Sequence, residues 1–228
     1  MRLIPVDSPS LVDDVIKKTV SPLSCEPYAQ RRMFPMTEAE VASQPSERTG
    51  FIVRERKVAE AWVQILHTIV TLGSLSETHY EDRQKEVLNL LTIVTDENPE
   101  QFDIPEFLPC SHDTIRRYLP SVLTGQKYEG VRYTYGQRLR THFGIDQIEA
   151  VIEKLVKEPI SRSAVASLWD PILDNKTGGS PCLNHVWVRI DQSKLHLTAV
   201  IRSNDMYNAW PENAFSLRAL QEYIRVEV

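Results

Sequence analysis

The feature that most constrains the fold is a pair of alternating segments near the C-terminus. Residues His185–Ile190 and Leu195–Ile201 alternate apolar and polar side chains and are rich in β-branched residues, a pattern typical of half-buried strands. The polar segment Asp191–Lys194 between them predicts a tight turn. We therefore expect an antiparallel hairpin whose open end brings Cys182 and Arg202 together.

A cysteine and an arginine at the same end of a hairpin form a candidate site. The thiolate is the nucleophilic form of cysteine, and a fixed positive charge lowers the pKa of a thiol. An arginine can equally hold a phosphate through its bidentate fork. Two plainer interpretations stay open at this point. A free cysteine such as Cys182 is most often a small buried apolar residue, and Arg202 could form a structural ion pair.

Four short motifs in a fixed order extend this site. The first two lie upstream and the other two flank the hairpin: Tyr135 to Arg140 (YGQRLR), Ser161-Arg162 with Ala166 to Pro171 (ASLWDP), Pro181-Cys182, and Arg202 to Asp205 (RSND) followed eight residues later by Asn213. Together they resemble the thymidylate synthase and deoxycytidylate hydroxymethylase superfamily. The resemblance covers residues from 58 to 228 and is closest to the compact archaeal-type members.

Helical periodicity appears on both sides of the hairpin. The spacing of apolar residues predicts four helices and one further strand. The first helix is expected over 58–70, closed by Gly73, and the second over 113–123, broken at Pro120. The third starts near Asp146 and ends before Pro159, and its apolar residues are Ile145, Ile148, Ile152, Leu155 and Val156. The fourth runs through Phe215, Leu217, Leu220 and Ile224, and the strand is expected over 86–95. This order predicts an α/β protein of the α+β type, a mixed β-sheet covered by helices. The resemblance implies a thymidylate-synthase-like fold and a homodimer packed through the sheet.

Two regions of different composition divide the chain. Residues 1–57 are polar and contain six prolines, which predicts an N-terminal arm or appendage. Residues 58–228 correspond to the thymidylate-synthase-like catalytic domain. The sequence ends at Val228, before the family's His-x-Tyr pair and its C-terminal tail. We therefore expect the C-terminal part of the family domain to be absent.

Charge and cysteine content exclude several classes of protein. A net charge of −5 gives no electrostatic reason to expect nucleic-acid binding, so local arginines would have to hold an anionic substrate. Three cysteines without CxxC spacing argue against a disulfide framework and against structural zinc, so no metal is expected. The sequence shows no signal-peptide pattern and no apolar run of membrane-spanning length. We expect a soluble, cytoplasmic enzyme.

The resemblance assigns chemistry to two side chains besides Arg202. Cys182 would add to C6 of a pyrimidine and so activate C5 toward a one-carbon electrophile. The donor would be 5,10-methylene-tetrahydrofolate or its tetrahydromethanopterin analogue. Tyr135 would assist proton removal from C5, although a tyrosine after a strand also serves as hydrogen-bonded packing.

Six residues are expected to bind the nucleotide, a pyrimidine nucleoside monophosphate. Arg202 and Ser203 would hold the phosphate, and Asp205 would order the site near the base. A carboxamide at Asn213 can pair with O4 and N3–H of uracil, which favours a uridylate; the same residue could instead cap a helix. The remaining two are Arg162, which would reach the phosphate in the partner of a dimer although Ser163 replaces a second arginine, and Arg83, which could equally be a solvated surface residue.

Departures from the family pattern leave the reaction open. Leu183 follows the cysteine where bacterial synthases carry histidine. The family's catalytic glutamate has no clear match. Aligning the glycine at the end of the family's glutamate-bearing helix with Gly125 puts Tyr118 at the position of the glutamate, and Glu86 is a looser candidate. Three hypotheses follow. They are a synthase acting on dUMP, a 5-hydroxymethylase acting on dUMP, CMP or dCMP, and a nucleotide-binding or assembly module without catalysis.

Overall fold

The computed structural model describes residues 49–228 apart from 78–82 and 177. These residues belong to one compact unit that runs from Ser46 to Val228. Residues 1–48, which make up most of the expected N-terminal arm, lie outside the described part. No helix in the described ranges is both long enough and apolar enough to cross a membrane.

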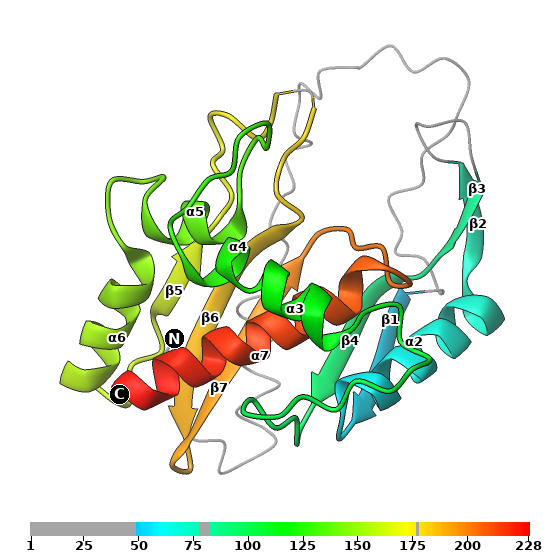
Figure 1. Ribbon diagram of the computed structural model, residues 1–228, viewed down its shortest axis with the longest axis horizontal. Helices are drawn as coiled ribbons and strands as arrows, with labels where there is room; N and C mark the ends of the chain where they lie inside the picture. Colours follow the sequence, from blue (N-terminus) through cyan, green and yellow to red (C-terminus); the bar gives the residue numbers. More distant parts are fainter. Residues whose placement is uncertain (1–48, 78–82, 177) are drawn as a thin grey trace, which may run out of the picture. The chain divides into compact units, whose positions relative to one another are not determined.

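A three-stranded antiparallel sheet forms the centre of the fold, in the order β5 (Ala164–Ser167), β6 (Leu183–Asp191) and β7 (Lys194–Ile201) (Figure 1). Strands β6 and β7 make the predicted hairpin. Gln192 and Ser193 in its turn have φ angles of 48° and 59°. Two successive left-handed residues give a two-residue turn the twist of the flanking strands. The prediction of the hairpin is confirmed, and β6 starts two residues earlier than expected.

Two helices cover one face of this sheet, α6 (Gln147–Lys157) and α7 (Ala209–Glu227). Helix α7, red in Figure 1, runs across the sheet, and α6 lies beside β5. Alternate residues of β5 and β6 point into this layer. The buried core that results includes Ala164, Ala166, Val186, Val188, Ile148, Leu155, Leu220 and Ile224.

The start of α6 explains a partial error in its predicted apolar face. Asp146 caps the helix, because its Oδ1 accepts hydrogen bonds from the backbone N–H groups of Ile148 (3.0 Å) and Glu149 (3.2 Å). Ile145 therefore precedes the helix and is exposed, and Val156 is exposed as well. Only Ile148, Ile152 and Leu155 of the five expected residues are buried.

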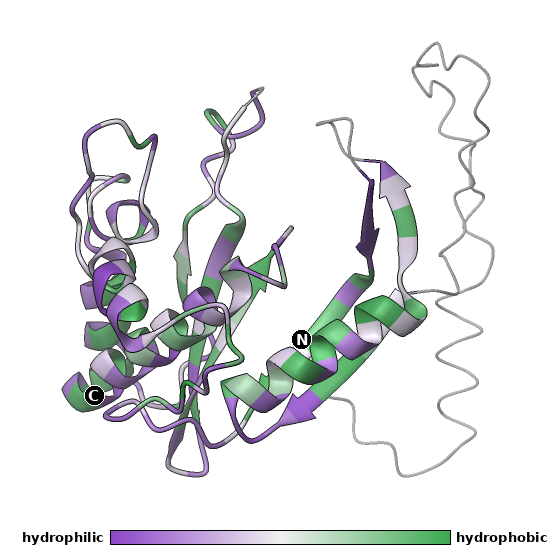
Figure 2. Ribbon diagram, turned by 45° about the vertical axis from the view of Figure 1, so that its right-hand side comes forward, coloured by the Kyte–Doolittle hydropathy of each residue, from purple (hydrophilic) through white to green (hydrophobic). Residues whose placement is uncertain are grey.

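A second layer packs around helix α2 (Val58–Leu72), which Gly73 ends as predicted. Strand β1 (Thr49–Glu55) pairs in parallel with β4 (Leu88–Val94), and β2 (Ser74–Glu77) pairs antiparallel with β3 (Arg83–Glu86). Apolar residues, green in Figure 2, follow α2 and the strands beside it. Their buried members join residues of α3 and α7 in a second core that includes Val53, Trp62, Ile65, Ile115 and Phe215.

Strand β1 lies within the segment that the sequence assigned to the arm. Val53 in this strand is only 4% exposed and packs in the core around α2. The expected boundary at residue 57 therefore differs from the structure, in which the compact unit starts at Ser46. The physical reason is burial, since one side chain of a short strand fills the space beneath the first helix.

Three short helices complete the unit: α3 (His112–Tyr118), α4 (Pro120–Leu123) and α5 (Tyr135–Arg140). The predicted break at Pro120 is confirmed, because this proline is the first residue of α4. Tyr135 begins α5 after the cap Thr134 and does not follow a strand, contrary to the sequence interpretation. Gly136 beside it is required by space, since a Cβ there would collide with the carbonyl oxygen of Thr124.

Candidate active site

The open end of the β6–β7 hairpin places the candidate nucleophile beside the candidate arginine. Cys182 is half-buried and immediately precedes β6, and Arg202 immediately follows β7. The backbone N–H of Arg202 donates a hydrogen bond to the carbonyl oxygen of Cys182, at 2.9 Å. The predicted proximity of these two residues is therefore confirmed.

The Arg202 side chain turns back over the segment that precedes Cys182. Its Nε donates to the carbonyl oxygen of Pro181 and its Nη2 to that of Ser180, each at 3.0 Å. The guanidinium carbon lies 5.8 Å from the ring centroid of Trp169. All of these partners are uncharged, and within the described residues no carboxylate forms an ion pair with Arg202. Its charge therefore stays uncompensated at an exposed position.

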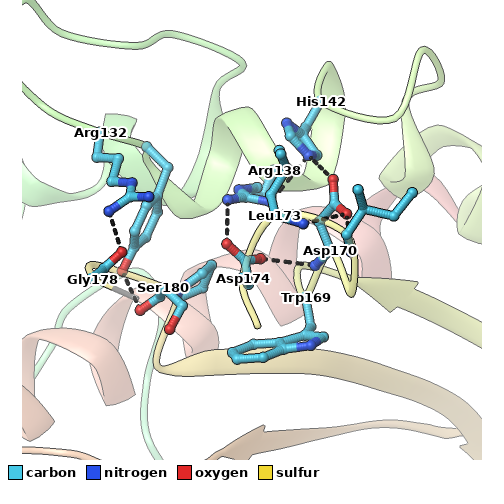
Figure 3. Close-up of polar contacts among 12 residues, drawn as sticks. Arg132, Arg138, His142, Trp169, Asp170, Leu173, Asp174, Gly178 and Ser180 are labelled. Carbon is cyan, nitrogen blue, oxygen red and sulfur yellow. Dashed lines mark hydrogen bonds and ion pairs between the residues drawn. The ribbon is translucent and has the colours of Figure 1, made fainter. Parts of the chain in front are cut away.

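The loop between β5 and Cys182 is anchored by a buried ion pair (Figure 3). Arg138 on α5 places Nη2 2.9 Å from Oδ1 of Asp174, and the two side chains are only 6% and 5% exposed. The other carboxylate oxygen of Asp174 accepts the backbone N–H of Asp170 at 2.8 Å. The pair thus fixes the first turn of the loop that leads to the thiol.

His142 extends this anchor to a second carboxylate. Its Nε2 lies 2.8 Å from Oδ2 of Asp170 and 3.0 Å from Nη1 of Arg138. The hydrogen bond from His142 holds the pKa of Asp170 below its ordinary value. Oδ1 of Asp170 in turn accepts the N–H groups of Ile172 (2.9 Å) and Leu173 (3.3 Å), which closes the turn.

Three tyrosines lie in the neighbourhood of Cys182. Burial raises the pKa of Tyr118, Tyr133 and Tyr135, and the neighbouring Cys182 adds to each shift. All three hydroxyls are therefore neutral near pH 7. Tyr133 donates to the carbonyl oxygen of Ser180 at 3.1 Å, and its ring stacks on Tyr135 with centroids 6.3 Å apart.

Asn213 is buried in the same region and is hydrogen-bonded on both sides. Its Oδ1 accepts the hydroxyl of Tyr118 at 2.8 Å, and its Nδ2 donates to Oδ1 of Asn204 at 3.3 Å. The helix-cap interpretation of Asn213 is wrong, because α7 begins earlier and its cap is Asn208. Asn204 was missed as a site residue, since it fills the variable position of the Arg-Ser-x-Asp motif and carries no signal of its own.

Asp205 orders the turn between β7 and α7. Its Oδ1 accepts the backbone N–H groups of Tyr207 (2.9 Å) and Asn208 (3.0 Å), and its Oδ2 accepts Nδ2 of Asn208 (3.0 Å). Ser203 is exposed beside Arg202 on the same turn. Both residues therefore lie at the hairpin end where the sequence placed them, and their contacts with a nucleotide stay predictions.

Two arginines of the predicted set lie apart from this end. Arg162 is exposed just before β5, whose first residue Ala164 pairs with Val188 of β6. That register puts Ala164 roughly 17 Å along the strand from the start of β6, and Arg162, two residues before Ala164, lies beyond it at the opposite end of the sheet. Arg83 is exposed at the start of β3. The structure does not bring either residue to Cys182 within this chain.

The two candidates for the missing glutamate separate clearly. Glu86 lies at the end of β3, where its carboxylate accepts hydrogen bonds from Ser76 and Gln84. Tyr118 at the end of α3 reaches Asn213 and contributes to the polar cluster near Cys182. Of the two, the structure places Tyr118 in the candidate site.

Cys110 is the other cysteine among the described residues. Burial, with a smaller contribution from Glu212, raises the pKa of Cys110 to about 11. Both thiols are free and half-buried, and Cys25 lies outside the described residues. Within the described ranges, no group of three or more His, Cys, Asp or Glu residues could hold a metal ion.

Fold and site together define an α/β protein in which an exposed arginine and a half-buried cysteine meet at one end of a hairpin, and sequence comparison agrees with the family resemblance. The family model described as "Thymidylate synthase" matches residues 98–227. Proteins named "Putative thymidylate synthase" are 35% identical over 180 residues in Methanococcoides burtonii (78% of this chain, 82% of that protein) and 36% over 174 residues in Methanopyrus kandleri (76% and 82%). The chain therefore belongs to the thymidylate synthase family.

Among solved structures, thermostable thymidylate synthase A from Bacillus subtilis is 29% identical to this chain. The alignment covers 44% of this chain and 39% of that chain, with a TM-score of 0.35.

Proposed function

We propose that this protein is a thymidylate-synthase-like transferase that adds a one-carbon unit to C5 of a uridylate, dUMP above all. The observation that carries the proposal is the pairing of a half-buried thiol, Cys182, with the uncompensated guanidinium of Arg202 at one end of a hairpin. A nucleophile and an anion-binding group are thereby fixed at one site. Family membership supplies the class of reaction.

In the proposed reaction, the Cys182 thiolate adds to C6 of the base and makes C5 nucleophilic. A tetrahydropterin, as 5,10-methylene-tetrahydrofolate or the methanopterin analogue, supplies the methylene carbon and the hydride. The half-buried aromatic side chains near the thiol, Trp169 and Tyr133, suit a flat bicyclic ring. The neutral hydroxyl of Tyr135 would help to move the C5 proton, and its proximity to Cys182 supports this role.

Arg202 and Ser203 would hold the nucleotide phosphate. The guanidinium of Arg202 donates to neutral carbonyl oxygens, so an anion gains the full charge interaction. Asp205 would keep the turn rigid under the base, and Asn213 would read uracil through its carboxamide. Arg83, exposed at the start of β3, would be a further phosphate ligand.

Arg162 would serve the site of a second subunit in a homodimer. The sheet face opposite α6 and α7 carries exposed apolar residues, Val165 at 49% and Val200 at 40% exposure, which suit a sheet-to-sheet interface. Arg162 flanks this sheet at the end remote from its own Cys182. A sedimentation experiment that found a fully active monomer would contradict this arrangement.

Tritium release from C5-labelled nucleotides tests the proposal directly. The protein would be incubated with dUMP, UMP, dCMP and CMP, each with and without methylene-tetrahydrofolate, and the product mass would be recorded. We expect release and a methyl mass gain with dUMP. A hydroxymethyl mass would point to the hydroxymethylase alternative, and binding without release from any nucleotide would point to a module without catalysis.

Two variants separate the proposed roles. Cys182→Ser should abolish tritium release and leave the Kd for dUMP nearly unchanged. Arg202→Ala should lose release and also weaken binding by about 10-fold to 100-fold, because it removes a charge-assisted contact with phosphate. An equal loss of affinity in the two variants would contradict this division of roles.

A further inference from the structure

The carboxamide of Asn213 has a defined polarity in the structure. Its oxygen faces the hydroxyl of Tyr118, 2.8 Å away, and its nitrogen faces Oδ1 of Asn204, 3.3 Å away. Asn213 is only 6% exposed, so water cannot replace either partner at low cost. The three side chains form a short relay in which every hydrogen bond donates in the same direction.

Tyr118 determines this direction. Burial keeps its pKa above the ordinary value, so the phenol carries its proton at neutral pH. Within the described residues, the only acceptor that the structure gives this proton is Oδ1 of Asn213. A phenol oxygen can also accept a hydrogen bond, but only a carboxamide that presents its oxygen gives the Tyr118 proton an acceptor.

The reverse orientation of the two carboxamides would give a partner to a donor that is unpaired in the structure. Nδ2 of Asn204 is buried and has no hydrogen-bond partner among the described residues. Rotating both carboxamides would bring this nitrogen against Oδ1 of Asn213, but would leave the Tyr118 proton facing an NH₂ group. An unpaired buried donor destabilises either arrangement. Each arrangement leaves one buried donor unpaired, but a phenol O–H is a stronger donor than an amide N–H, so the hydroxyl of Tyr118 favours the observed polarity.

We propose that Tyr118 is a positioning residue that fixes the orientation of the Asn213 carboxamide and thereby makes the site select uracil over cytosine. The inference rests on the proposed function, because it requires a pyrimidine facing Asn213. Tyr118 acts on the base through Asn213 and does not itself need to touch the reacting atoms.

Selectivity follows from the hydrogen-bond patterns of the two bases. Uracil presents a donor at N3 and an acceptor at O4, and cytosine presents an acceptor at N3 and a donor at N4. The orientation of the base would be set by Cys182 at C6 and by Arg202 at the phosphate. With the base held in this way, only one polarity of the carboxamide fits uracil, and the other fits cytosine.

Binding of dUMP and dCMP to the full chain and to Tyr118→Phe tests the proposal. Removing the hydroxyl leaves the two carboxamide orientations nearly equal, so affinity for dUMP should fall and affinity for dCMP should rise. We expect the Kd for dCMP divided by the Kd for dUMP to drop by about 5-fold to 10-fold, which corresponds to the loss of one net hydrogen bond. Tyr133→Phe is the matched control, because it removes a hydroxyl that donates to the Ser180 carbonyl and not to Asn213; its ratio should stay unchanged.

A second variant tests the relay from its other end, at Asn204. Asn204→Asp replaces the carboxamide with a carboxylate, which can only accept and so can pair only with Nδ2 of Asn213. Added to Tyr118→Phe and measured at pH 8, this change should restore most of the selectivity for dUMP. A double variant as unselective as Tyr118→Phe would overturn the proposal.

The outcomes also separate this inference from the proposed function. If the unaltered protein binds neither dUMP nor dCMP, both are overturned. If it prefers dUMP and Tyr118→Phe keeps the same ratio of Kd values, the role of Tyr118 alone is overturned. A fall in the ratio for Tyr118→Phe but not for Tyr133→Phe supports both.

Discussion

The two ends of the loop between β5 and β6 are held by arginines in opposite ways. At the first end, Arg138 meets the carboxylate of Asp174 in a pair that is almost fully buried. At the second end, Arg132 donates to the carbonyl oxygen of Gly178, and Arg202 donates to the carbonyl oxygens of Ser180 and Pro181. Both arginines of the second end are exposed.

The difference separates a structural role from a binding role. A buried guanidinium must be matched by a buried carboxylate, and together the two can do little but hold the chain. A guanidinium on neutral carbonyl groups also holds the chain, but its charge remains available to an anion. The loop is therefore built from one anchor at Asp174 and one charged end next to Cys182.

Removing the buried carboxylate should have the largest effect on stability. Asp174→Ala leaves the charge of Arg138 buried and unpaired, so the free energy of unfolding should fall by about 3–5 kcal/mol. Urea unfolding would measure this loss. Arg202→Ala, the matched change at the other end, should cost less than about 1 kcal/mol. Equal losses would remove the distinction between the two ends.

Thiol labelling at pH 8 should distinguish Cys182, at the charged end, from Cys110. A pKa of about 11 leaves Cys110 with about one thiolate in a thousand molecules at that pH. We expect iodoacetamide to modify Cys182 at least about 10-fold faster, and dUMP to protect it. Peptide mass spectrometry would follow both sites. Loss of protection by dUMP in Arg202→Ala would sharpen the comparison, whereas equal rates at the two thiols would contradict it.

Acid should weaken the anchor at the first end of the loop and leave the Arg202 end unchanged. We expect this change in stability to be the smallest of the three effects. The pKa of Asp170 is lower in the folded state because His142 hydrogen-bonds its carboxylate. The resulting stabilisation is present above the unfolded pKa, about 4, and is lost as pH falls through the folded value. Urea midpoints between pH 6 and pH 3 should therefore fall more steeply for the unaltered chain than for Asp170→Asn. Arg202→Ala should run parallel to the unaltered chain, because only carbonyl groups accept its hydrogen bonds; identical slopes for Asp170→Asn would contradict the role of His142.

Local patterns made part of this structure predictable. The hairpin, the helix ended by Gly73 and the break at Pro120 follow from period and turn chemistry within a few residues of sequence. The same reasoning placed Cys182 and Arg202 at one end, since a hairpin fixes their proximity. Strand β1 escaped prediction because its place depends on burial of Val53 beneath α2.

The polar contacts of the site were not predictable in the same way. Arg138 and Asp174 are 36 residues apart, and Tyr118 and Asn213 are 95 apart. No local period links such pairs, and their charges or hydroxyls look like ordinary surface residues in the sequence. From the sequence, Tyr118 was considered only because it aligns with the absent glutamate of the family, and Asn204 was not predicted as a site residue.

The position of Asn213 on α7 has a consequence for the order in which the site forms. Phe215 on this helix packs in the core around α2, and Leu220 and Ile224 pack in the core under the sheet. A hairpin of about 20 residues is enough to bring the Cys182 thiol and Arg202 together. The contact of Asn213 with Tyr118 also requires that α7 pack in both cores, and contacts that close long loops form late. During synthesis of the chain, the pair of Cys182 and Arg202 would therefore form before the contact between Asn213 and Tyr118 that selects the base.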